Sequence, residues 1–132
     1  MNRKHFGWVA AVVLAAMGQG AFAEDFDGSK PLICATVEAN GCAPDEACTR
    51  GSPTALGAPA FLRVNVAKKE VAGPQRTTAI KTIEKSDEQL LLMGTELGFG
   101  WTIAIERTTG AMAATMVGRD GAFALFGACV LP

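Results

Sequence analysis

Residues 99–106 read FGWTIAIE, and this stretch decides the fold class. Trp101, Ile103 and Ile105 alternate with smaller or polar residues, so the large apolar side chains share one face of an extended chain. An alternation with a period of two is typical of a half-buried β-strand. We therefore expect a strand here, with one face in a core.

The same kind of pattern continues on both sides of this stretch. Polar turns such as 107–110 (RTTG) and 118–121 (GRDG) follow at intervals of roughly 10 to 12 residues, a spacing typical of all-β sandwiches and barrels. The expected strands are 31–38, 61–66, 70–72, 76–84, 89–95, 99–106, 111–117 and 122–131. For residues 31–38 (PLICATVE) a short helix stays open, because periodicity does not separate the two at this length.

These strands predict an all-β fold, a small antiparallel up-and-down meander of about eight strands. A meander of this size most simply closes into a barrel, which removes its exposed edges. The following residues are expected to point inward: Leu62, Val64, Trp101, Ile103 and Ile105. Arg63 is expected on the opposite face, and three further aromatic residues are interpreted as core: Phe99, Phe123 and Phe126.

Residues 1–23 are predicted to be a cleaved signal peptide. Arg3 and Lys4 precede an apolar stretch over residues 9–17, and Ala21 and Ala23 are the small residues that a signal peptidase reads. The apolar stretch is shorter than the about 20 residues of a spanning helix, so no membrane span is expected after cleavage. Residues 24–132 are then a single domain, periplasmic or secreted.

The composition of residues 24–132 excludes some partners. This segment of 109 residues has ten basic and thirteen acidic side chains, a net charge of −3. A nucleic-acid-binding domain needs a basic face, so no nucleic acid is expected as a partner.

The four cysteines predict two disulfides, as is usual in a short exported chain. Zinc is disfavoured because no C-x-x-C pair is present. The expected pairing is Cys34–Cys129 with Cys42–Cys48, because closing the meander brings its first and last strands together, whereas Cys42 and Cys48 share one loop. The rival pairing joins Cys42 or Cys48 to Cys129.

Residues 39–59 contain three Gly, three Pro and two Cys without periodicity, and they predict a long, disulfide-stapled loop. Structureless loops of more than about 12 residues are uncommon and often functional. Within residues 40–53 the loop presents Asp45, Glu46 and Arg50, which we interpret as a candidate interaction surface.

The residues of common enzyme sites are missing. The one histidine is His5 in the signal peptide, there is no tyrosine, and no serine lies in a G-x-S-x-G motif. This excludes Ser-His-Asp and Cys-His catalysis, and no P-loop or G-x-G-x-x-G motif is present. The acidic pairs 45–46 and 87–88 have polar neighbours and are interpreted as solvated charge. No enzymatic activity and no cofactor are therefore expected.

Two groups of residues that partly resemble metal-binding motifs are interpreted as structural residues. Asp25, Asp27 and Ser29 resemble only the start of a calcium loop, which needs later ligands, and residues 24–30 are expected to be a loose arm. Three methionines are interpreted as core filling rather than as copper(I) ligands: Met93, Met112 and Met116. No metal site is expected.

Several segments carry a resemblance across most of the chain. They are PLICATVEANGC (31–42), CTRGSP (48–53), FLRVNV (61–66), GFGWTIAIE (98–106), TGAMAATM (109–116) and FALFGAC (123–129). Together they resemble a group of small exported proteins of proteobacteria, which implies export and no particular activity. The architecture is also similar to that of the periplasmic C-type lysozyme inhibitors, but no inhibitory residue carries over, because the chain has no tyrosine.

These observations favour a non-enzymatic binding or protein-interaction module, secreted or periplasmic, whose partner is an unknown envelope protein or a small molecule. One alternative is a carrier of a small hydrophobic ligand in the mouth of the barrel. Another is an envelope protein that acts like a lysozyme inhibitor.

Overall fold

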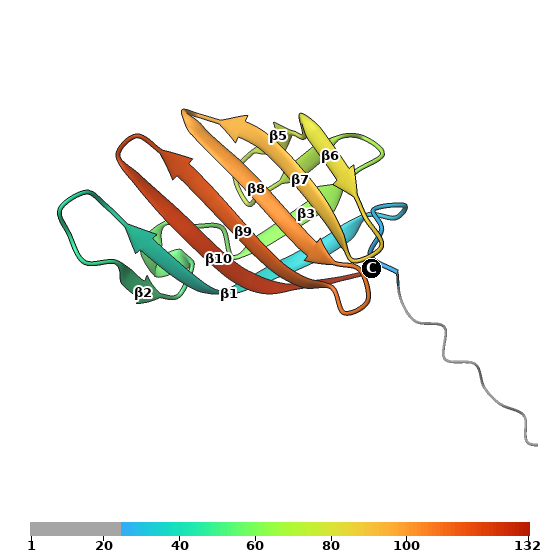
Figure 1. The fold of residues 1–132 in the computed structure, drawn as a ribbon, viewed down its shortest axis with the longest axis horizontal. Coiled ribbons are helices and arrows are strands. Elements are labelled where there is room, and N and C mark those ends of the chain that lie inside the picture. Colours follow the sequence, from blue (N-terminus) through green and yellow to red (C-terminus); the bar gives the residue numbers. More distant parts are fainter. Residues whose placement is uncertain (1–24) are drawn as a thin grey trace, which may run out of the picture.

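The computed structural model describes residues 25–132, and the predicted signal peptide lies outside them. The described chain contains ten strands and one 3-10 helix (Figure 1). The elements are β1 (Leu32–Cys42), β2 (Thr49–Gly51), η1 (Thr54–Leu56), β3 (Phe61–Asn65), β4 (Glu70–Ala72), β5 (Thr77–Ala79), β6 (Thr82–Lys85), β7 (Gln89–Glu96), β8 (Phe99–Glu106), β9 (Ala111–Gly118) and β10 (Gly121–Val130).

All the strands belong to one curled antiparallel sheet, in the order β5-β4-β3-β1-β10-β9-β8-β7-β6, with β2 paired to β1. The all-β meander is therefore confirmed. The expected element 31–38 is a strand and not a helix: it is β1, which runs from Leu32 to Cys42. β1 pairs with the last strand, so that Cys34 lies opposite Cys129. The first and last strands are neighbours, as the closure argument requires.

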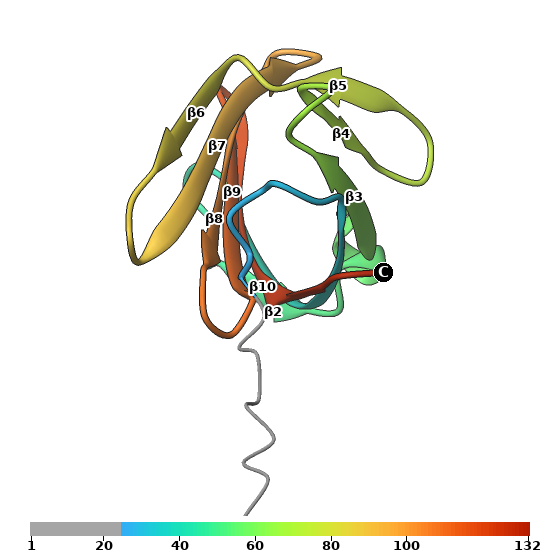
Figure 2. The same cartoon turned by 90° about the vertical axis from the view of Figure 1, so that its right-hand side faces the viewer.

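The sheet is an open half-barrel rather than a closed barrel, and its seam lies in the middle of the chain (Figure 2). Residues 76–84 were expected to form one strand but form β5 and β6, the two sheet edges. At the break, the Ile80 N–H donates to the Lys69 carbonyl while the Lys81 N–H donates to the Met93 carbonyl. Consecutive residues thus bond to opposite walls, and β5 and β6 stand at the two ends of the sheet order.

Residues 25–31 are ordered and cross the open side of the half-barrel, so the expectation of a loose arm is wrong (Figure 2). The Arg107 guanidinium donates to both Asp25 carboxylate oxygens, at 2.7 and 3.0 Å. The Phe26 N–H donates to the Arg107 carbonyl, and the Phe26 side chain is buried. Gly28 packs against both Val66 and Leu90, so the arm joins the walls formed by β3 and β7.

The core lies inside the curl. The five side chains expected to point inward are buried, and Arg63 is exposed, so the facing of β3 and β8 is confirmed. Met112 is buried among them. The core assignment of Phe126 is wrong, because Leu125 and Cys129 take the inner face of β10. Phe126 lies an odd number of residues from both, so it points outward and is 46% exposed. Phe99 and Phe123 are half-buried.

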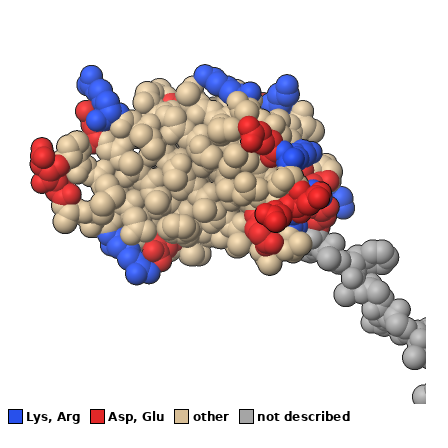
Figure 3. Space-filling model, viewed as in Figure 1, with Lys and Arg blue, Asp and Glu red and all other residues tan. Residues whose placement is uncertain are grey.

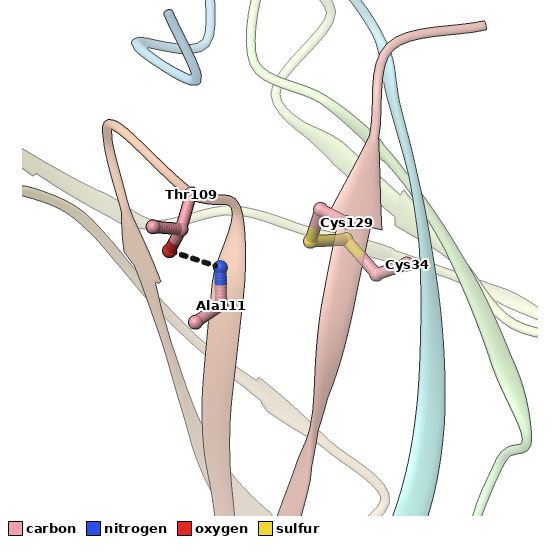
Figure 4. Close-up of a disulfide and its surroundings, with 4 residues drawn as sticks. All are labelled: Cys34, Thr109, Ala111 and Cys129. Carbon is pink, nitrogen blue, oxygen red and sulfur yellow. Dashed lines mark hydrogen bonds between the residues drawn. A yellow bond between two sulfur atoms is a disulfide. The ribbon is translucent and has the colours of Figure 1, made fainter. Parts of the chain in front are cut away.

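Two disulfides join the cysteines in the predicted pairs. Cys34–Cys129 crosses between β1 and β10, beside the turn in which the Ala111 N–H donates to Thr109 Oγ1 (Figure 4). Cys42–Cys48 closes a hairpin of β1 and β2. The segment 39–59 is therefore more ordered than expected. Disulfides are typical of proteins in oxidising compartments.

No helix within residues 25–132 has both the length and the apolar character needed to cross a membrane.

Candidate functional site

A cavity of about 560 Å³ opens between the β3–β5 wall and the β7–β10 wall of the half-barrel. Ligand pockets usually measure about 300–1,000 Å³, so this volume suits a small molecule. The inner wall is apolar, and its side chains come from five different strands: Leu62, Val71, Trp101, Ile103, Ala114, Met116 and Leu125. The segment around η1, from Thr54 to Ala60, forms a further side of the cavity.

The cavity occupies only part of the interior. Where the N-terminal arm crosses, the space between the walls is filled by side chains with almost no exposed area, among them Leu32, Val64, Leu90 and Ile105. Leu32 pairs across the sheet with Val64, and Leu90 with Ile105, so each wall contributes one packed pair. The half-barrel is thus closed by its core at one end and hollow at the other.

The mouth of the cavity carries the polar groups. An ion pair joins Arg76 Nη1 and Glu96 Oε1 at 3.6 Å, between the β4–β5 turn and the end of β7. Beside it, the Thr78 hydroxyl donates to the Thr95 carbonyl at 3.2 Å. Because both side chains of the ion pair are partly exposed, the pair contributes little to stability and is free to face a polar group of a ligand.

Leu97 holds an exposed apolar side chain at this mouth in an unfavourable conformation. Glu96 pairs with Phe99, so Leu97 and Gly98 form the two-residue turn between β7 and β8. Both have positive φ, +47° for Leu97 and +83° for Gly98, as in a type I′ turn, where Asn-Gly is the preferred sequence. A leucine in the left-handed region costs roughly 1–2 kcal/mol, yet its side chain is 73% exposed and packs in no core.

Trp101 forms part of the inner wall and depends on the absence of a side chain at Gly94. A Cβ at Gly94 would lie 2.4 Å from Trp101 Cζ2 and 2.7 Å from the Ala79 carbonyl oxygen. Gly94 therefore allows the indole ring and the β5 edge to approach the backbone of β7. The indole N–H of Trp101 is buried and has no hydrogen-bond partner within residues 25–132.

The predicted interaction loop is divided by the structure. Asp45 and Glu46 are exposed between β1 and β2, where Asp45 has a φ of +61°. Arg50 lies apart from them on β2, and its Nη2 is 2.6 Å from a carboxylate oxygen of Glu38. A smaller hollow of about 270 Å³ lies at the base of this hairpin, with Glu46 and Phe123 among its lining residues.

Three partly exposed carboxylates have perturbed pKa values with local causes. Hydrogen bonds from the Arg50 and Asn40 side chains hold the pKa of the Glu38 carboxyl below its ordinary value. The Thr108 and Thr109 side chains do the same to the pKa of Glu106. A hydrogen bond from Ser29 lowers the pKa of Asp27. Each is a turn or strand-surface contact.

The acidic residues of the described chain do not gather into a site. Asp25 is held by Arg107, and Asp27 accepts the Ser29 N–H at 2.8 Å. Asp87 and Glu88 are exposed in the turn between β6 and β7. Within residues 25–132 no group of three or more metal-ligating side chains comes together.

Sequence reasoning placed the cavity only in general terms, at the mouth of a barrel. It did not identify Arg76, Glu96 or Leu97, because Arg76 reads as the first residue of an expected strand and the turn 96–98 reads as an ordinary connection. One signal was present in the sequence, since Leu97-Gly98 stands where a two-residue hairpin turn favours Asn-Gly.

Comparisons of this chain with protein families, curated proteins and solved structures found no match. Its function is therefore argued from the geometry of the cavity and the hairpin.

Proposed function

We propose that this chain is a periplasmic or secreted, non-enzymatic binding protein that takes a small apolar molecule into the half-barrel. The observation that carries the proposal is the cavity of about 560 Å³, which has an apolar inner wall and a polar mouth. Such a cavity, with few convergent polar groups, is the usual form of a small-molecule site. The predicted signal peptide supports the location.

The arrangement of the walls favours an amphiphilic ligand. An apolar tail would contact Trp101, Ile103 and Leu125 inside, and a polar head would remain at the mouth beside Arg76 and Glu96. Leu97 supports this reading, because strained residues are retained where the surrounding structure or a function requires them. In this proposal its exposed side chain contacts the end of the tail nearest the polar head.

Trp101 gives a direct test, because it is the only tryptophan after residue 23. The protein is titrated with N-phenyl-1-naphthylamine and, separately, with lauric acid, while the Trp101 emission is recorded. We expect a saturable change in intensity and a rise in the unfolding temperature at saturating probe, since a ligand that binds only the folded state stabilises it.

A cavity-filling variant identifies the place of binding. Ala114→Leu adds three carbons to the inner wall and is expected to weaken probe binding by at least about tenfold, or roughly 1.4 kcal/mol. Ala67→Leu, in the exposed turn between β3 and β4, makes the same change away from the cavity and should leave binding unaltered. Equal affinities of the two variants, or no saturable signal from the unmodified protein, would refute the proposal.

The hairpin of β1 and β2 supports a second candidate function, recognition of a protein partner. Its two acidic residues, Asp45 and Glu46, are presented on a segment held by the Cys42–Cys48 disulfide, and in Figure 1 this hairpin extends beyond the rest of the sheet. The resemblance to the C-type lysozyme inhibitors that the sequence suggests makes a C-type lysozyme the first partner to try.

The test is a lysis assay with bacterial cell walls. If the hairpin inhibits lysozyme, the double variant Asp45→Lys/Glu46→Lys should lose inhibition. Asp87→Lys/Glu88→Lys makes the same charge change in the exposed β6–β7 turn and should retain inhibition. Lysis at full rate with the unmodified protein excludes inhibition of C-type lysozyme and leaves the cavity proposal unaffected.

A further inference from the structure

One wall of the half-barrel is apolar on both faces. An antiparallel sheet with one face in water usually alternates apolar residues inside with polar residues outside. The wall of β7, β8, β9 and β10 does not follow this rule on its outer face. In β9 the outward positions are Ala111, Ala113, Thr115 and Val117, although Met112 and Ala114 already fill the inner face.

The neighbouring strands continue this surface, in register. Outward Ala113 lies between Ala104 of β8 and Phe126 of β10, and Thr115 lies between Thr102 and Ala124. We call the outward-facing residues of 91–95, 100–104, 111–117 and 122–130 the outer patch. It contains no charged side chain.

Charged residues surround the outer patch instead. Figure 3 shows the face of the molecule seen in Figure 1, with a broad uncharged centre and both blue and red side chains around it. At one end of the wall Glu106 is bonded by Thr108 and Thr109. At the other, Arg119 Nε lies 3.4 Å from an Asp120 carboxylate oxygen. The border therefore has mixed sign, without the excess of basic side chains that would draw the patch to an anionic membrane.

Several large side chains of the outer patch are exposed to water. Phe126 is 46% exposed, and Val117 and Val130 are each 56% exposed. Contiguous apolar surface of this kind marks an interaction site on a soluble protein, because leaving it in water costs about 25 cal/mol per Å².

The area of the outer patch agrees with a weak homodimer. Its four segments hold 26 residues, which at about 3.4 Å per residue and about 4.8 Å between strands cover roughly 420 Å² in projection. Two such faces together remove about 850 Å², which is less than the about 1,000 Å² of a stable interface and lies at the low end for weak, transient ones. We expect a dimer of micromolar rather than nanomolar affinity.

The uncharged, small side chains of the outer patch suit it to bind a second copy of this chain. A two-fold interface places the same surface on both sides, so the surface must complement itself. Small uncharged side chains do so without like charges meeting, and they allow two sheets to pack at the usual separation of about 10 Å. We propose that the protein forms a two-fold homodimer through the outer patch, with the ligand cavities on the opposite faces of the two sheets.

The protein is expressed from its full-length gene, and its export and processing are verified by mass. Sedimentation velocity then follows its oligomeric state from about 1 µM to about 300 µM, a range that brackets micromolar dissociation constants. We expect a concentration-dependent shift from monomer to dimer. Ala113→Arg brings two guanidinium groups into the interface, and like charges there cost several kcal/mol, so its dissociation constant should rise at least about tenfold.

Ala67→Arg is the matched control, since it adds the same charge to the exposed β3–β4 turn and should dimerise as the unmodified protein does. Thermal unfolding checks that each variant folds, and Val117→Lys replaces Ala113→Arg if the latter does not. A protein that stays monomeric at the highest concentration overturns the proposal, as does a dimer that both patch variants leave intact. Flotation of monomer with phosphatidylglycerol vesicles would also overturn it, in favour of a lipid surface.

Discussion

Removal of the Cys34–Cys129 disulfide should destabilise the protein far more than removal of Cys42–Cys48. The two cysteine pairs are separated by 95 and 6 residues in the sequence. In the chain-entropy description, a cross-link stabilises the fold by restricting the unfolded chain, and the effect grows with the logarithm of the loop length. The separations give about 4.7 kcal/mol for the long loop and about 2.4 kcal/mol for the short one.

Packing increases the difference in stability between the two disulfide variants. Cys34 and Cys129 are buried between β1 and β10, so replacing both with alanine also removes two sulfur atoms from the core. Cys42 and Cys48 lie in the hairpin, half-buried and exposed respectively, where their sulfur atoms contribute less packing. The double variant Cys34→Ala/Cys129→Ala should therefore lose at least about 2 kcal/mol more than Cys42→Ala/Cys48→Ala.

Urea unfolding followed by Trp101 fluorescence measures this difference, and both double variants avoid an unpaired thiol. For a domain of this size, a difference of about 2 kcal/mol corresponds to roughly 8–16 °C in unfolding temperature. Equal losses in the two variants, or a larger loss for the hairpin pair, would refute the reasoning that the long-range bond constrains the unfolded chain more.

Three further predictions concern single residues. Trp101→Ala should lower the free energy of unfolding by about 3–5 kcal/mol, whereas Arg63→Ala on the exposed face should lower it by less than about 0.5 kcal/mol. Small, similar losses for both variants in urea melts would contradict the inward facing of Trp101 on β8 and the outward facing of Arg63 on β3. Gly94→Ala should lower the free energy of unfolding by more than about 2 kcal/mol, because the added Cβ has no room beside Trp101. Gly57→Ala should lower it by about 1 kcal/mol, since the space there is open and only the positive φ opposes a side chain. A larger loss in urea melts for Gly57→Ala than for Gly94→Ala would show that contact with the indole ring is not limiting. Hydrogen bonds from Thr108 and Thr109 hold the pKa of folded Glu106 below its ordinary value of 4.5, so the stability that they contribute is present above pH 4.5 and is lost as the pH falls through the lower folded pKa. The stability deficit of Glu106→Gln at pH 7 should therefore shrink as the pH is lowered below 4.5; a deficit independent of pH in urea melts would contradict this origin.

The strands were predictable where one residue in two is apolar. In β3 and β8 the alternation around Val64 and Ile103 determined both the element and its buried face. It failed in β10, because AFALF is apolar at every position and gives no facing signal, so Phe126 was assigned to the core. The facing of that strand depends on its pairing with β1 and β9, which is long-range information.

The seam and the cavity could not be predicted for a related reason. Nothing local distinguishes Ile80 and Lys81 from the middle of a continuous strand, since only their hydrogen bonds to Lys69 and Met93 divide it. The volume of the cavity likewise depends on how far apart the two walls stand, and that distance follows from long-range packing, including that of the arm and the segment around η1. The disulfide pairing, in contrast, followed from topology alone.

The pairing of β1 with β10 has a consequence for the oxidation of the nascent chain. Synthesis proceeds from the N-terminus, so Cys34, Cys42 and Cys48 are all made before Cys129. An oxidant that joins cysteines in order of appearance would link Cys34 to Cys42, a bond absent from the native protein. Cys34 must either remain reduced until the last strand arrives or be released from a wrong partner by thiol–disulfide exchange. The position of the first strand beside the last thus makes the native disulfides depend on the order in which the cysteines are oxidised, or on the rearrangement of an early wrong pair.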